Sequence, residues 1–355
     1  MNRIEKLMKA LPENADAAII TSDVNRRYFT GLGSSAGTLL AFRDAAYFII
    51  DFRYIEVAKA TVTGAEVILQ DKLYEQLGEL LKKHGARTVA IETGYLTVGE
   101  LDLYRTKLPD CEFSTAATLN DAILEMRSLK DESEIAAIRK AQSITDAAFL
   151  EILDFIKPGK TEKEIAAYLE YCMRRLGADG LAFETIAAGG PNSAMPHAVP
   201  GDRPLQQGDF FTMDYGAAWG GYCSDMTRTV ALGPATEEMR KVYDTVLRAQ
   251  LAGIAASHAG ASGKSVDGAA RDIITEAGYG PYFGHSYGHS LGLLIHEAPN
   301  ASMRNDKPMP AGAVVSAEPG IYIPDKFGVR IEDVTVITDT GCEILTKSPK
   351  NLIIL

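Results

Sequence analysis

An internal repeat in the second half of the chain constrains its fold more than any other feature. GKTEKEIAAYLEYCMRRLG at 159–177 and GASGKSVDGAARDIITEAG at 260–278 each run from Gly to Gly and suit a helix. Each is followed by an apolar stretch that ends in an acid and a glycine, RPLQQGDFFTMDYG at 203–216 and KPMPAGAVVSAEPG at 307–320. These stretches align without a gap. The repeat predicts two α/β halves related by pseudo-two-fold symmetry, with a site where the halves meet.

The first half carries two acids that a hairpin would bring together. Asp214 lies in FFTMDYG, and Asp225 follows it in GYCSDMTRTVAL. A turn at Trp219 and Gly220 would make these carboxylates direct cross-strand neighbours on one face, with Cβ atoms roughly 5 Å apart.

The second half repeats this arrangement. The alignment superimposes Glu318 on Asp214, and a turn centred on Asp325 would place Glu318 opposite Glu332. Both hairpins are otherwise rich in apolar residues, so the acids are expected to be buried.

Four carboxylates facing one another in apolar strands must take up protons or bind cations. For any single acid, a solvated surface position or an ordinary ion pair would be the default interpretation. Two matched pairs instead favour two divalent ions bridged by carboxylates. Mostly oxygen ligands with one imidazole indicate manganese, cobalt, iron or zinc, and not a thiolate site.

Half of the six histidines lie in GHSYGHSLGLLIHEAPN, residues 284–300. As a helix, this stretch would place His285, His289 and His296 on one face, as if to bind one zinc ion. Glycines at 284, 288 and 292 make such a helix poor, and there is no HExxH arrangement.

The first third alternates strand and helix signals and predicts a small α/β domain. Expected strands are 17–20, 37–42, 45–50, 67–69 and 89–92, and expected helices follow residue 51 and span 73–84 and 98–108. A charged helical stretch then begins, and Asp131 with Glu134 forms a capping box. We therefore predict two domains, residues 1–124 and 125–355.

Composition excludes several classes of protein. The net charge of -11 argues against nucleic-acid or anionic-membrane partners. No apolar run approaches the roughly 18 residues of a membrane span, and the N-terminus lacks the apolar core of a signal peptide. The four cysteines are scattered without a CxxC pair, which favours a reducing cytoplasm.

Five motifs resemble the ligand signature of the pita-bread metallopeptidases, family M24. They are the Asp of MDYG, the Asp of SDMTRT, the His of GHSLG, the Glu of EPG and the Glu of RIED, in the order of the Xaa-Pro aminopeptidase and prolidase branch. FETIAAGGPNSAMPHAVPGDRPL, NRRYFTGLGSSAG and DFRY also resemble that branch. The implied fold is α/β (α+β): a small creatinase/prolidase-type domain, then a pita-bread catalytic domain with a curved, mainly antiparallel sheet.

The resemblance implies a role for each matching residue. Two divalent metals would be bound by Asp214, Asp225, His289, Glu318 and Glu332. Asp225 and Glu332 would bridge both metals, and Glu318 would also act as acid and base. The positions that match the family's substrate-side residues are His197, His285, His296 and Arg330. Independently, Arg330 lies two residues before Glu332, so both side chains project from the same strand face.

The implied activity is hydrolysis of the N-terminal Xaa-Pro bond in proline-containing peptides or dipeptides. The Xaa-Pro amide lacks an N–H and has a restricted φ, so a groove that relies on that N–H handles it poorly. Glu318 would move a proton to the leaving proline nitrogen, and Asp214 would lie beside a free substrate amine. We expect manganese, with cobalt, zinc or iron as alternatives, and a homodimer.

Three related functions are alternatives. A methionine aminopeptidase shares the ligand pattern, but usually lacks such an N-terminal domain and has a longer interval between its last two glutamates. A creatinase-like hydrolase, or a non-catalytic pita-bread binding module, usually loses metal ligands. Two residues depart from the family pattern: Ser290 replaces the usual Gly after the ligand His, where it could crowd the metal or narrow the substrate channel, and Leu294 replaces a frequent acid.

Overall fold

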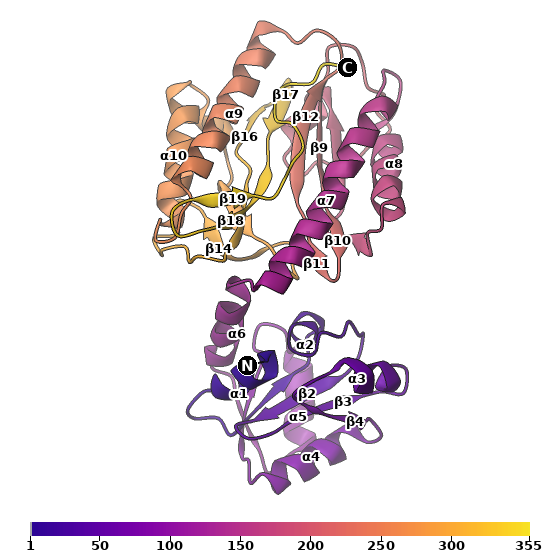
Figure 1. The fold of residues 1–355 in the computed structure, drawn as a ribbon, viewed down its shortest axis with the longest axis vertical. Helices are drawn as coiled ribbons and strands as arrows, with labels where there is room; N and C mark the ends of the chain where they lie inside the picture. The colour runs from indigo at the N-terminus through magenta and orange to yellow at the C-terminus, as the bar shows by residue number, and fades with distance from the viewer. Residues whose placement is uncertain (1) are drawn as a thin grey trace. The chain divides into compact units, whose positions relative to one another are not determined.

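The computed structural model describes residues 2–355, and its internal contacts divide the chain into two compact units, Met1–Arg127 and Ser128–Leu355 (Figure 1). We expected a boundary between residues 124 and 125. Helix α6 (Thr118–Ser128) runs through that point, and the units divide near its C-terminal end. Among residues 2–355, no helix has both the length and the hydropathy that a membrane crossing needs.

The first unit contains one six-stranded sheet of order β4-β3-β2-β1-β5-β6. Its strands are β1 (Ala17–Ile20), β2 (Thr38–Phe42), β3 (Ala46–Ile50), β4 (Glu66–Leu69), β5 (Thr88–Ile91) and β6 (Glu112–Ser114). Its other helices are α1 (Arg3–Lys9), α2 (Asp23–Thr30), α3 (Ile55–Thr61), α4 (Leu73–Lys83) and α5 (Val98–Lys107). The apolar runs predicted this alternation, but not β6 or α2. A signal for α2 was present, because Ser22 caps it by accepting from the Asn25 N–H.

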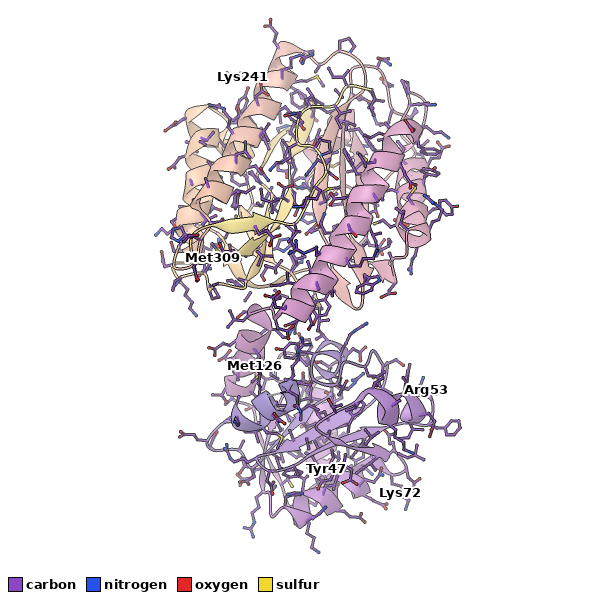
Figure 2. The ribbon with its side chains drawn as sticks, in the orientation of Figure 1. Tyr47, Arg53, Lys72, Met126, Lys241 and Met309 are labelled. Carbon is purple, nitrogen blue, oxygen red and sulfur yellow. The ribbon has the colours of Figure 1, made fainter. Side chains whose placement is uncertain are left out.

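His84 has a packing role in the first unit. Its ring stacks on Phe42, with centroids 4.0 Å apart, and its Nε2 lies 2.9 Å from the hydroxyl of buried Tyr47. Figure 2 labels Tyr47 among the side chains of this unit. The partly buried ring therefore packs between two aromatic residues of the sheet.

The second unit places helix pairs on opposite sides of its strands (Figure 1). One pair is α7 (Glu132–Phe155) with α8 (Glu162–Arg175), and the other is α9 (Glu237–Ala256) with α10 (Gly263–Glu276). The strands of the first half are β7 (Gly180–Leu181), β8 (Ile186–Gly189), β9 (Phe210–Tyr215), β10 (Ala217–Trp219), β11 (Tyr222–Cys223) and β12 (Met226–Ala231). Those of the second half are β13 (Gly288–Ser290), β14 (Glu297–Ala301), β15 (Val314–Ala317), β16 (Gly320–Ile323), β17 (Phe327–Arg330), β18 (Asp333–Ile337) and β19 (Cys342–Ile344). These described strands pair antiparallel.

The sequence repeat is a structural repeat. Thr161 and Ser262 cap α8 and α10, and each hydroxyl accepts a hydrogen bond from the backbone N–H three residues on. Thr161 also forms an isolated antiparallel bridge with Pro204, and Ser262 forms the same bridge with Pro308. Each half therefore ties its helix start to the beginning of its acid-bearing strand in the same way.

The first hairpin turns one position later than predicted. Asp214 is paired with Thr227, so the prediction that it faces Asp225 directly was wrong. The turn residues are Gly220 and Gly221, with φ of 60° and 88°, because a two-residue turn with both φ positive matches the twist of the strands. The shift amounts to two residues along the partner strand, so both acids still face one side of the sheet.

The second hairpin has the predicted register. Ala317 pairs with Asp333, and the β16–β17 hairpin continues that register, which places Glu318 opposite Glu332. Asp325 occupies the turn with a φ of 61°. The acids of the second half are thus directly opposite each other, whereas those of the first half are offset by two residues along the strand.

Replacing Thr161 with Ala should destabilise the second unit by about 1 kcal/mol, because the hydroxyl accepts from the Glu164 N–H in a capping box. Urea unfolding measures the change. Ser143→Ala is the control, since that hydroxyl donates to a carbonyl inside α7 and caps no helix end; its effect should stay within about 0.5 kcal/mol. Equal losses in the two variants would show that the cap contributes nothing.

Candidate metal centre

The predicted site residues gather around one cavity of about 760 Å³ in the second unit. Eight of the nine line it: His197, Asp214, Asp225, His285, His289, His296, Glu318 and Arg330. Glu332, the ninth, does not line the cavity, but one of its oxygens lies within 4.8 Å of ligand atoms of Asp225 and His289. The structure therefore brings all nine residues to one place.

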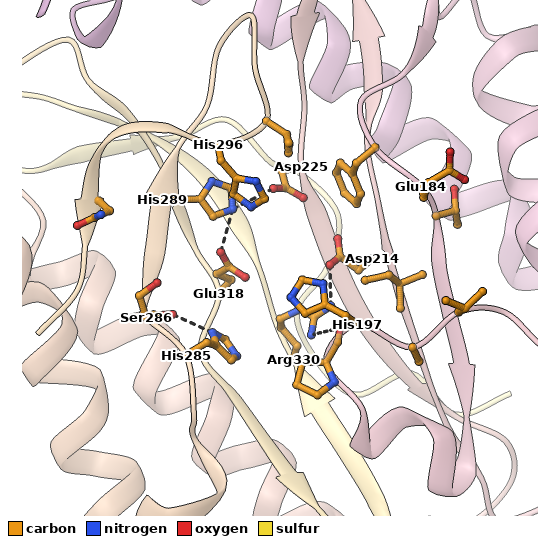
Figure 3. A pocket seen from close by; sticks show the side chains of 18 of the residues that line it. Glu184, His197, Asp214, Asp225, His285, Ser286, His289, His296, Glu318 and Arg330 are labelled. Atoms are coloured by element: carbon orange, nitrogen blue, oxygen red, sulfur yellow. Dashed lines mark hydrogen bonds and ion pairs between the residues drawn. The ribbon is translucent and has the colours of Figure 1, made fainter. Parts of the chain in front are cut away.

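His289 lies between acids from both halves. Its Nε2 is 3.1 Å from Oε1 of Glu318 and 3.6 Å from Oδ2 of Asp225 (Figure 3). The Ser316 hydroxyl donates to the same Glu318 oxygen at 3.0 Å and accepts from the His289 backbone N–H at 3.0 Å. Strand β15 thereby connects the histidine to the glutamate.

Two buried carboxylate oxygens of the cluster lack a hydrogen-bond partner. Arg330 donates to Oδ2 of Asp214 at 2.6 Å, and Thr227 donates to Oε2 of Glu332 at 2.7 Å. The other oxygens, Oδ1 of Asp214 and Oε1 of Glu332, are buried with no partner. An unpaired buried oxygen costs free energy that a bound cation would offset. The donor set therefore fits metal ions.

The acids of the cluster also resist ionisation. Burial, followed by the charges of neighbouring carboxylates, raises the pKa of Asp225 and of Glu332 well above the usual range. Burial also raises the pKa of Asp214, even though Arg330 opposes it. These groups would have to hold protons unless cations lay among them.

Glu318 behaves differently. Burial alone would raise its pKa, but the hydrogen bond and charge of His289, together with the charge of Arg330, lower it to about 2. Glu318 is therefore ionised at neutral pH.

Tyr322 is a site residue that sequence reasoning missed. Its hydroxyl lies 2.9 Å from Nε2 of His285 and accepts from Nη1 of Arg330 at 2.8 Å. Tyr322 pairs across the hairpin with Gly328, whose missing Cβ leaves room for the ring. The sequence held one signal for Tyr322: in the hairpin that ends at Arg330, this aromatic residue lies opposite a glycine.

The remaining histidines line the cavity without joining the cluster of acids. The ring of His296 packs edge-on against His289, with centroids 4.3 Å apart. Burial is the main cause that lowers the pKa of both His285 and His296, so these rings are neutral near pH 7. His197 is exposed and lines the cavity together with Arg330 and Asp214; all three are labelled in Figure 3.

Ser290 neither crowds the cluster nor narrows the cavity. Its side chain is fully buried outside the cavity lining, and its Oγ accepts from the Lys130 ammonium at 3.2 Å. Leu294 is 38% exposed, and its backbone N–H donates to Glu297. Two effects were considered for Ser290, crowding of the metal and narrowing of the substrate channel, and its position outside the cavity lining beside Lys130 supports neither.

Comparisons with known proteins agree with this geometry. The profile of Metallopeptidase family M24 matches residues 136–339, and that of the Creatinase/Prolidase N-terminal domain matches residues 1–128. The chain is 38% identical over 354 residues to the Xaa-Pro dipeptidase of Pyrococcus furiosus, covering 99% of each protein.

Two solved structures share the whole fold. An Xaa-Pro dipeptidase from Bacillus anthracis is 41% identical, covers 99% of both chains and superimposes with a TM-score of 0.95. An X-Pro aminopeptidase from Thermotoga maritima is 37% identical, covers 100% of both chains and has a TM-score of 0.94. The predicted fold class is confirmed.

Asp225→Asn should separate the repulsion within the cluster from metal binding. Without metal at pH 8, the variant should be at least as stable as the wild type, because it removes a carboxylate whose pKa burial raises. Wild-type protein should gain about 2.7 kcal/mol at Mn²⁺ concentrations of 100 times Kd, and the variant should lose most of that gain. Thermal unfolding with and without Mn²⁺ measures both effects. Exposed Asp339→Asn is the control, and an unchanged Mn²⁺ response in Asp225→Asn would rule out Asp225 as a ligand.

Proposed function

The chain belongs to metallopeptidase family M24, and from this premise we propose that it is a dinuclear-metal-dependent exopeptidase. Its reaction is hydrolysis of the N-terminal Xaa-Pro bond in proline-containing peptides or dipeptides. One observation carries the proposal: four carboxylates and one imidazole line or adjoin a single cavity, and two of the buried carboxylate oxygens have no partner.

Asp214, Asp225, His289, Glu318 and Glu332 would hold the two metals, and Asp225 and Glu332 would bridge them. When bound, two divalent ions supply an activated water near neutral pH and polarise the scissile carbonyl. Ligand chemistry dominated by oxygen suits manganese, with cobalt, zinc or iron as alternatives.

Glu318 is the proposed acid and base. With a pKa of about 2 it is a carboxylate at neutral pH, so it can accept a proton from the attacking water. The proton then passes to the proline nitrogen as the C–N bond breaks. The Ser316 hydroxyl donates to Oε1 of Glu318 and leaves Oε2 for this transfer.

The substrate is oriented by groups that need no amide N–H from it. His285 and His296 are neutral, so they can hydrogen-bond the peptide carbonyls without adding charge. His197 lies at the exposed side of the cavity. Arg330 holds Asp214, whose remaining oxygen would face the free amine of the substrate. An amine bound there would limit cleavage to the first peptide bond.

Specific observations speak against each of the three alternative functions. A methionine aminopeptidase usually lacks an N-terminal domain of the kind matched over residues 1–128. A creatinase-like hydrolase or a binding module would lose metal ligands, whereas here four of the five proposed ligands line one cavity and Glu332 adjoins it.

The proposal also covers the compartment, the partners, the oligomeric state and the domains of the protein. Four free cysteines among the described residues suit a reducing cytoplasm. The net charge of -11 disfavours nucleic acid and anionic membranes as partners. We propose a homodimer, which sedimentation velocity would test. The two domains are proposed as a creatinase/prolidase-type domain before residue 125 and the catalytic domain after it.

Purified protein loaded with Mn²⁺ should hydrolyse Xaa-Pro or Xaa-Pro-Xaa peptides and leave matched Xaa-Ala peptides almost intact. Removing the metal with a chelator should abolish activity, and adding Mn²⁺ back should restore it. Rates on Leu-Pro against Leu-Pro-Ala decide between a dipeptidase and an aminopeptidase. Cleavage of Met-Ala peptides in preference to both would favour a methionine aminopeptidase, and no turnover of any of them would refute the proposal.

Glu318→Gln should lower kcat on the preferred Xaa-Pro peptide by about 10²–10⁴-fold, because the amide cannot accept the proton. KM should change much less, since the side chain keeps its shape. Glu151→Gln is the matched control, because Glu151 pairs with Arg175 outside the cavity and should leave kcat unchanged. An active Glu318→Gln enzyme would eliminate Glu318 as the proton carrier.

A further inference from the structure

A buried lysine lies beside Ser290, the residue that departs from the family's motif. The Lys130 ammonium is 3.2 Å from Oγ of Ser290 and 3.1 Å from Oε2 of Glu297. Only 1% of the Lys130 side chain and 4% of the Glu297 side chain are exposed. A charge this deeply buried needs an opposite charge and further hydrogen-bond partners, and these two residues supply both.

The three residues meet at an irregularity in the strand that carries His289. His289 of β13 pairs with Asn300 of β14, but the next residue, Ser290, pairs with Glu297. The partner strand thus has extra residues at this step. A bulge bends the strand that carries the extra residues, here β14, and increases the local twist of the strand pair. The residue of β13 at this step is His289, whose imidazole points at Glu318 (Figure 3).

The side chains of Lys130 and Glu297 pack closely against the backbone around the bulge. A Cβ at Gly292 would lie 2.9 Å from Oε2 of Glu297 and 3.0 Å from Cε of Lys130, so a larger residue there would have to displace the ion pair. Oε1 of Glu297 accepts from the Leu294 N–H at 3.0 Å. Both oxygens of Glu297 are therefore engaged within the protein, although Glu297 lines the cavity.

On the basis of the metal-dependent function proposed for this chain, we propose that Lys130, Ser290 and Glu297 form a clamp that positions His289. The ion pair joins the chain just before α7 to β14, and the Ser290 hydroxyl attaches β13 to it. The bulge is thereby held in one geometry, and Nε2 of His289 stays near Asp225 and Glu318. The three residues act through His289 and are positioning residues.

Two variants test the clamp without leaving a buried charge unpaired. Ser290→Ala keeps the ion pair and removes only the hydroxyl. Lys130→Met with Glu297→Gln neutralises both charges. Outer partners of metal-ligating histidines typically affect metal affinity by 10–100-fold. We expect Mn²⁺ affinity to fall about tenfold in Ser290→Ala and about a hundredfold in the double variant. Competition against a chelator measures the affinity, and circular dichroism verifies the fold.

Arg139→Met is the control, because it breaks an ion pair of 2.6 Å with Glu343 in the same unit, away from the cavity lining. Its Mn²⁺ affinity should equal that of the wild type. A loss of affinity in both clamp variants, with an unchanged control, supports the clamp. Wild-type affinity in both folded clamp variants would overturn it, whatever their thermal stability.

The same measurements separate the clamp from the proposed function. A wild-type protein that binds Mn²⁺ but cleaves no Xaa-Pro peptide would refute the function, and the affinity ratios would still decide the clamp. Unchanged affinity ratios with active wild-type enzyme would refute the clamp and leave the function standing.

Discussion

Repulsion among four buried carboxylates is the constraint on which the second unit depends. A cation within the protein offsets part of this repulsion, because Arg330 lies against Asp214 and lowers the pKa of the clustered acids. Next to the cluster lies Arg228, with 1% of its side chain exposed. Arg228 donates to the backbone carbonyls of Thr227 and Glu332 and pairs with Asp333 at 2.8 Å. The unpaired oxygens that remain are those that metal ions would satisfy.

The pseudo-two-fold arrangement explains how the ligands reach one cavity. The first half supplies two acids, and the second supplies two acids and the histidine. The halves meet where the Glu332 N–H donates to the Thr227 carbonyl. Buried acids of α8 and α10 also hold the loops that carry substrate-side histidines: Glu162 accepts from the Gly189 and Gly201 N–H groups, and Asp267 accepts from the Tyr287 N–H.

The nine residues predicted from the sequence do lie in or beside one cavity, but the predicted strand register of the first hairpin was wrong. The repeat located both acid-bearing strands, and cap residues located the helix starts. The stagger of the first hairpin was wrong, because Gly220 and Gly221 can both adopt positive φ and the turn forms there. Tyr322 was missed because its role depends on which side chains lie across the cavity. The effect of Ser290 stayed open because its surroundings depend on Lys130, which is 160 residues away along the chain.

The sequence by itself predicted the duplicated fold and nine residues that the structure places in or beside one cavity, because local signals carry them: apolar periodicity, helix caps, acids at strand ends and short motifs. Only the tertiary structure decided which carboxylate oxygens remain unpaired, which acids resist ionisation, and that Lys130 reaches Ser290 across 160 residues of chain. Burial and long-range contacts set these properties, and both depend on where distant segments pack, which no local pattern specifies.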